Sequence, residues 1–172
     1  MAKVDLLLPF ILKWEGGFVN DPLDAGGATN MGVTLYTYAV YCKRKGYQTA
    51  TVEDLKNINK YQVIDILKVM YWNRWQADKI NNQSLANILV DWVWCSGIHG
   101  IKIPQKLLLL KQDGRVGPIT LAAINNPDPE KLFNVIKAER LAFVHRIVNR
   151  SPSQKRFIKG WENRINDFKF EP

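Results

Sequence analysis

The sequence predicts a mostly α-helical (α+β) protein with seven to nine helices and one very small β-hairpin after the first helix. Hydrophobic residues recur at intervals of three and four over most of the chain, which is the period of an amphipathic helix. Gly, Pro, Asn and Asp, which begin and end helices, separate these segments. Turn-forming residues are concentrated in one stretch, residues 18–33. A chain of 172 residues is long enough to bury a substantial core.

The first helix is expected to begin between residues 5 and 8, because Pro9 is tolerated only near the start of a helix. Four hydrophobic residues lie on one face of it: Leu7, Phe10, Ile11 and Trp14. Gly16 and Gly17 should end this helix. Glu15 is therefore placed in its last turn, at the edge of the buried face.

Further helices are expected over residues 34–45, 60–74, 84–96, 103–110, 118–124, 130–149 and 152–168, and a short helix is expected to begin at residue 51. Thr34 is a candidate N-cap, and Thr51 with Asp54 resembles a capping box. The helix over 84–96 is strongly apolar, so we expect it to be the central buried helix. Asp91 is notable because it lies inside that helix.

The net charge of +8 is unevenly distributed. Residues 102–172 contain 14 Lys and Arg against 7 Asp and Glu, whereas residues 1–101 contain 10 against 9. A basic C-terminal part favours a polyanionic partner such as nucleic acid, an anionic membrane or an acidic cell-wall polymer. The alternative is a solvated surface that keeps the protein soluble.

The two cysteines could form a disulfide pair, and no cluster of cysteine and histidine has the spacing of a zinc site. Cys42 and Cys95 are expected to be free buried thiols, since no export signal is visible. His99 and His145 are isolated, so we expect no metal and no other cofactor.

Chemistry is expected at Glu15. The apolar neighbours Trp14 and Phe18 and the negative end of the helix dipole should raise the pKa of its carboxyl group, and Asp21 and Asp24 follow closely. A protonated acid opposite an ionised carboxylate is typical of glycoside hydrolysis. The alternative is that Glu15 is an ordinary residue at a helix end.

Residues 14–34, WEGGFVNDPLDAGGATNMGVT, resemble the signature of the glycoside hydrolase 108 family, the phage- and prophage-type N-acetylmuramidases, some of them labelled secretion activator proteins. The second half resembles the predicted peptidoglycan-binding region that accompanies this family. The matching parts there are residues 91–97, Gln105, residues 113–120 and residues 157–164.

The resemblance implies a lysozyme-like fold and cleavage of the β-1,4 bond between N-acetylmuramic acid and N-acetylglucosamine. The catalytic acid of the family corresponds to Glu15. Similar phage-type lysozymes follow a Glu-x8-Asp-x5-Thr pattern, which Asp24 fits and Thr29 meets one residue early. Asp21 is a rival for the role of Asp24, and the choice between retention and inversion stays open.

The substrate-binding candidates are Phe18, Asp21, Tyr36, Trp72 and Asp91. Aromatic side chains could stack on sugar rings or pack in the core. Asp91 could instead be a hydrogen-bonded structural residue behind the site. The motif over residues 113–120 could bind peptide or glycan, or only support the fold.

We expect a lysozyme-like catalytic region over residues 1–96 and a helical peptidoglycan-binding region over residues 97–172, packed into one compact unit. The expected partners are peptidoglycan glycan strands, without nucleic acid, stable membrane insertion or oligomerisation. No signal peptide is visible, so synthesis in the cytoplasm and release through a holin or a secretion system are expected. The rival class is a non-catalytic protein that binds the wall or regulates secretion.

Overall fold

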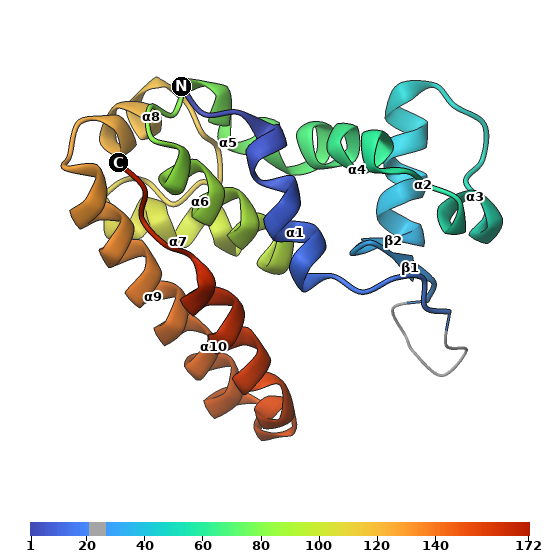
Figure 1. Ribbon diagram of the computed structural model, residues 1–172. Coiled ribbons are helices and arrows are strands. Elements are labelled where there is room, and N and C mark those ends of the chain that lie inside the picture. The colour runs from blue at the N-terminus through green and yellow to red at the C-terminus, as the bar shows by residue number, and fades with distance from the viewer. Residues whose placement is uncertain (21–26) are drawn as a thin grey trace. The chain divides into compact units, whose positions relative to one another are not determined.

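The computed structural model describes residues 1–20 and 27–172 and is mostly helical with one small antiparallel sheet, which confirms the predicted fold class (Figure 1). The chain forms two compact units, one of residues 3–73 and one of residues 1–2 and 74–172. This division rests on compactness and does not test the predicted division at residue 96, which stays a prediction. No helix in the described part of the chain has the length and apolar character needed to cross a membrane.

The first unit contains η1 (Val4–Leu6), α1 (Leu8–Trp14), β1 (Thr29–Asn30), β2 (Val33–Thr34), α2 (Leu35–Lys45), α3 (Val52–Lys56), α4 (Lys60–Leu67) and η2 (Lys68–Trp72). Leu7 and Ile11 have no exposed surface, as their place on the apolar face of the first helix predicts. The single helix expected over residues 60–74 is interrupted by a π-helical turn, η2, before it continues into α5 (Asn73–Trp75).

Local signals determine the helix ends in this unit. Thr34 accepts a hydrogen bond from the Thr37 N–H at 3.1 Å, which confirms it as the N-cap of α2. Gly46 ends the same helix with φ 72°, a left-handed conformation that favours glycine. Thr51 and Asp54 form the predicted capping box of α3.

The sheet is a two-residue hairpin in which Thr29 pairs with Thr34 and Asn30 with Val33. The connecting residues Met31 and Gly32 have φ values of 49° and 77°, so both lie in the left-handed region. Positive φ at both central positions matches the right-handed twist of antiparallel strands and makes a tight hairpin.

The second unit contains η3 (Ala77–Lys79), α6 (Gln83–Ser96), α7 (His99–Leu107), α8 (Pro118–Asn125), α9 (Pro129–Arg150), η4 (Pro152–Phe157) and α10 (Ile158–Asp167). Helix α6 is its central buried helix, as predicted, and residues 84–86 and 88–93 of it are buried. Helices α9 and α10 lie side by side and run in opposite directions, joined by η4 (Figure 1).

Helix α7 begins four residues earlier than the predicted residue 103, because Gly100 is a packing residue rather than a helix breaker. A Cβ atom at Gly100 would lie 2.5 Å from the backbone nitrogen of Val93 and 2.6 Å from the carbonyl carbon of Trp92. Only glycine therefore allows α7 to approach the backbone of α6 this closely. Pro104 is accommodated inside the helix.

Two predictions about buried side chains are wrong in part. The sequence predicts that the last helix buries Phe157 together with Trp161 and Ile165, but Phe157 lies in the 3₁₀ turn η4 before that helix and is 42% exposed. Both cysteines are free, as expected, but only Cys42 is buried and Cys95 is exposed.

Candidate active site

Glu15 lies one residue beyond α1, not in its last turn as predicted. Its φ and ψ are −100° and 138°, so its backbone is extended, although its N–H still donates to the carbonyl oxygen of Ile11 at 3.0 Å. The direction of its half-buried side chain is therefore set by the segment that leaves the helix. The prediction that Glu15 lies at the edge of the buried face assumed the period of a helix, which does not extend to this residue.

The two glycines after Glu15 leave open space beside it. A Cβ atom added to Gly16 or Gly17 would have no atom within 4 Å, and neither residue has a positive φ. Neither close packing nor backbone strain therefore requires glycine here. The physical consequence is a stretch of backbone without side chains directly after Glu15 in the chain, which a bulky substrate can approach.

The segment that follows returns to the hairpin through one antiparallel pair. Val19 and Thr29 exchange two backbone hydrogen bonds, each 2.8 Å long. The chain between them begins and ends at this pair. It contains Asp21 and Asp24, which lie outside the described residues, so their predicted roles stay predictions.

Thr29 is the central residue of this small β element. It pairs with Val19 on one side and with Thr34 on the other, and its side chain is half-buried. Val19 comes four residues after Glu15, and four peptide steps span at most about 14 Å. Glu15 and Thr29 therefore belong to one small neighbourhood of the first unit, as their assignment to one site requires.

Asn30 holds this element in place, and its role was missed in the sequence. Its side chain is 5% exposed and donates from Nδ2 to the carbonyl oxygens of Leu55 and Lys56, each at 3.0 Å. These carbonyls are at the C-terminal end of α3, where backbone acceptors lack partners within the helix. An Asn one residue before a turn is normally interpreted as a turn former, so the sequence contained no sign of this long-range contact.

The aromatic candidates differ in exposure. Phe18 is half-buried with the ammonium group of Lys56 5.9 Å from its ring centre, and Tyr36 is 79% exposed. Both have surface available to a sugar ring. Trp72 has no exposed surface, so in this structure it packs in the core.

One cluster of titratable side chains ties α2 to α4. The hydroxyl group of Tyr41 donates to Asp65 at 2.5 Å, and the ammonium group of Lys45 lies 2.9 Å from the same carboxylate. These two hydrogen bonds, the one from Tyr41 first, lower the pKa of Asp65. Burial raises the pKa of neighbouring Tyr38 to about 12.

Asp91 lies in the second unit and has no exposed surface. Its Oδ1 accepts from Arg164 at 2.7 Å and its Oδ2 from Arg140 at 3.0 Å. Arg140 also donates to the carbonyl oxygen of Ile88 at 3.1 Å, and its guanidinium carbon lies 5.6 Å from the ring centre of Trp92. This is the geometry of a structural ion-pair cluster that joins α6 to α9 and α10.

The motif over residues 113–120 is held by Gln105, which is 1% exposed. The Gln105 side chain donates to Asp113 at 3.1 Å and to the Arg115 carbonyl at 2.9 Å, and accepts from the Gly114 N–H at 2.9 Å. The backbone N–H of Arg115 and the amide of Gln105 lower the pKa of Asp113. These contacts support the loop itself, which is the structural alternative that the sequence left open.

Comparisons with known proteins cover both units. Residues 8–97 match the family described as Glycosyl hydrolase 108, and residues 99–166 match the one described as Predicted Peptidoglycan domain. The fold is similar to the solved structure of SagA from Brucella abortus, with a TM-score of 0.72 and 27% sequence identity over 96% of this chain and 94% of that one. No curated protein matches the sequence.

Proposed function

The chain belongs to the glycosyl hydrolase 108 family, and from this premise we propose that it is an N-acetylmuramidase that uses Glu15 as its general acid. Membership of the family makes it a glycoside hydrolase, and the adjoining peptidoglycan domain indicates peptidoglycan as the substrate. The bond that we propose is the β-1,4 bond between N-acetylmuramic acid and N-acetylglucosamine.

The pairing of Val19 with Thr29 is the observation that supports this proposal most strongly. It attaches the β element, with Thr29 at its centre, to Val19, which comes four residues after Glu15 in the chain. The loop that contains both aspartates starts and ends at the same pair. All the proposed catalytic residues are therefore attached to one short piece of backbone.

The proposed chemistry follows from the acid and its surroundings. Glu15 donates its proton to the leaving glycosidic oxygen, beside the bare backbone of Gly16 and Gly17. A carboxylate from Asp24, or from its rival Asp21, stabilises the oxocarbenium-like transition state or activates water. Thr29 positions that water or the substrate by a hydrogen bond from its hydroxyl group.

The decisive experiment replaces Glu15 by Gln, which keeps the shape of the side chain but removes the acid. The parent protein should release reducing sugar from purified peptidoglycan, and Glu15→Gln should lower the rate by at least about 100-fold, the usual contribution of a general acid. Glu53→Gln, at an exposed acid on α3, is the matched control and should keep full activity. Circular dichroism should be the same for all three proteins.

A Glu15→Gln variant that hydrolyses the wall as fast as the parent would show that the acid is another residue. A parent protein that binds peptidoglycan but releases no reducing sugar would favour the non-catalytic alternative, a wall-binding or secretion-regulating protein.

The partners of Glu15 can be ranked by the rates of three single variants, Asp21→Asn, Asp24→Asn and Thr29→Val. Replacement of the second catalytic carboxylate should lower the rate of hydrolysis by orders of magnitude. Replacement of a residue that only assists binding should lower it a few-fold. Equal small losses for both aspartates would remove the two-carboxylate mechanism.

A further inference from the structure

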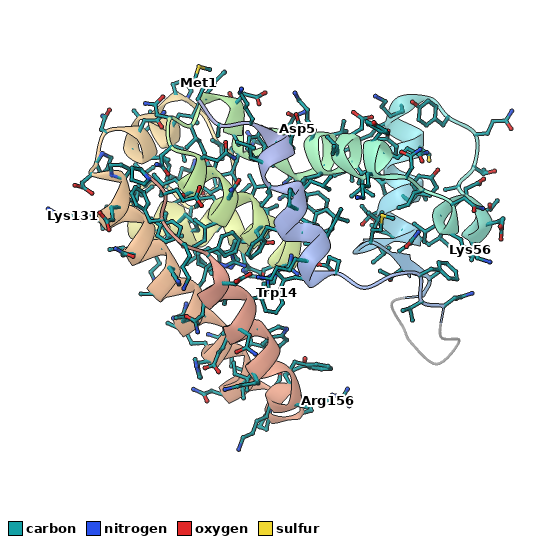
Figure 2. The ribbon with its side chains drawn as sticks, in the orientation of Figure 1. Met1, Asp5, Trp14, Lys56, Lys131 and Arg156 are labelled. Atoms are coloured by element: carbon teal, nitrogen blue, oxygen red, sulfur yellow. The ribbon has the colours of Figure 1, made fainter. Side chains whose placement is uncertain are left out.

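A basic surface lies at the end of the α9–α10 hairpin. Residues 140–161 contain six Lys and Arg and no Asp or Glu. Helix α9 ends at Arg150, η4 makes the turn, and α10 begins at Ile158. Figure 2 shows Arg156 at the end of this hairpin, where η4 joins the two helices.

Two of the six cations are neutralised by acids of the same unit. Arg140 is buried against Asp91, and Arg146 pairs with Glu139. The other four, which we call the basic tip, are Arg150, Lys155, Arg156 and Lys159. All four are exposed, and none forms an ion pair with an acid in the part of the chain that the structure describes.

An aromatic surface lies among these cations. Phe157 is 42% exposed, and the guanidinium carbon of Arg156 lies 4.6 Å from its ring centre. The ring of Trp161 stacks on Phe157 from α10, with their centres 5.9 Å apart. This support fixes the ring of Phe157 beside the charges, so the tip presents cations and one aromatic ring together.

We propose that the basic tip and Phe157 form a docking surface for peptidoglycan, separate in sequence from the residues around Glu15. Peptidoglycan combines sugar rings with the carboxylates of its stem peptides. The carboxylates would pair with the cations, and a sugar ring would stack on Phe157. The inference rests on the proposed substrate, and the tip lies inside the matched peptidoglycan domain, residues 99–166.

The hydrophobic content of the tip favours a wall polymer over an anionic membrane. Binding of a protein to a membrane interface scales with the apolar area that it buries there. Between residues 140 and 172, Phe157 is the only large hydrophobic residue that is strongly exposed. One ring is enough to stack on a sugar but offers little area for a bilayer.

The test measures sedimentation with insoluble peptidoglycan in the Glu15→Gln background, so that the polymer stays intact. The tip variant carries Lys155→Gln, Arg156→Gln and Lys159→Gln. The control removes the same charge from exposed positions outside the tip, with Lys106→Gln, Lys111→Gln and Lys131→Gln. Both variants should have the circular dichroism spectrum of the parent.

The tip variant should bind peptidoglycan about tenfold more weakly at low salt, since three exposed ion pairs of modest strength are lost. The affinity of the control should change by less than about twofold. The difference should shrink as salt is raised. A separate Phe157→Ala variant should bind a few-fold more weakly at every salt concentration, because stacking is not screened.

Equal binding by the tip variant and the control would overturn the proposal. So would tip-dependent binding to phosphatidylglycerol vesicles with peptidoglycan binding unchanged, which would assign the tip to a membrane. Hydrolysis by the parent is measured separately as reducing sugar. A parent that hydrolyses nothing but binds peptidoglycan through the tip would refute the muramidase and support this inference.

Discussion

The side-chain amide of Asn30 donates to the carbonyl oxygen of Leu55 at 3.0 Å, 25 residues away in the sequence. A second bond of the same length reaches the carbonyl oxygen of Lys56. The hairpin that contains Thr29 is therefore tied to the end of α3. The proposed active site depends on this bond, because a hairpin of two-residue strands is not stable on its own.

Asn30→Ala should lower the free energy of unfolding by about 1–3 kcal/mol, because the hydrogen bonds from the buried Asn30 amide to the carbonyl oxygens of Leu55 and Lys56 are lost. Urea denaturation measures the change. Asn57→Ala is the control, since Asn57 makes its side-chain bonds at the exposed surface of α3, and it should cost less than about 1 kcal/mol. Equal costs for the two variants would mean that Asn30 does not anchor the hairpin.

Asp91→Asn should destabilise the second unit by about 3–5 kcal/mol, because the buried guanidinium group of Arg140 loses its ion pair with Asp91. Thermal unfolding followed by circular dichroism measures the loss. The matched control is Glu139→Gln, which breaks the more exposed pair with Arg146 and should cost no more than about 1 kcal/mol. An Asp91→Asn variant as stable as the control would refute the structural role of the cluster.

Gly100→Ala should be strongly destabilising, because the new methyl group would lie 2.5 Å from the backbone of Val93 and push α7 away from α6. Overpacking of this kind costs about 1–3 kcal/mol or more. Gly160→Ala provides the contrast, since a Cβ atom there meets nothing within 4 Å. Alanine at Gly160 in α10 should be neutral or stabilise by up to about 1 kcal/mol. Similar losses in both variants would contradict the close approach of the two helices.

Asp65 should contribute a pH-dependent stability to the first unit. Its native pKa is lowered, chiefly by the hydroxyl group of Tyr41 and then by Lys45, so its contribution is fully present above its unfolded pKa of about 3.9. The contribution is lost as the pH falls through the lowered native pKa. The Asp65 side chain is 38% exposed, so the gain at neutral pH should stay below about 1 kcal/mol.

Urea unfolding of the parent and Asp65→Asn between pH 2 and 7 checks this prediction. The two stabilities should differ at neutral pH and converge at the acid end, where Asp65 is protonated in both states. Tyr41→Phe should remove part of the same pH dependence. A difference that persists unchanged in acid would mean that the carboxylate charge is not its cause.

Local patterns allowed most of the helices to be predicted. The caps at Thr34 and Thr51 depend on residues within three positions, and the structure has both as predicted. The buried face of α6 follows from its 3.6-residue period. The start of α7 could not be predicted this way, because Gly100 makes a close contact with another helix, α6, that no local pattern reveals.

The candidate site was predicted less completely than the helices. Glu15 was expected in the last turn of the first helix, but it lies after the helix with an extended backbone, and its catalytic role stays a prediction. The sequence could not show that Tyr36 is exposed and Trp72 is buried, because both are aromatic residues in or beside helical segments. Their exposure depends on what packs against each helix.

By itself, the sequence determined the helical fold class and the short turn-rich β element, because these depend on residues close together in the chain. Only the tertiary structure decided that Asn30 anchors the hairpin, that Asp91 is the centre of a buried ion-pair cluster, and that Phe157 is exposed among cations. Each of these outcomes depends on packing or hydrogen bonds between segments far apart in the sequence, and the periodicity of a single segment contains no record of its partner.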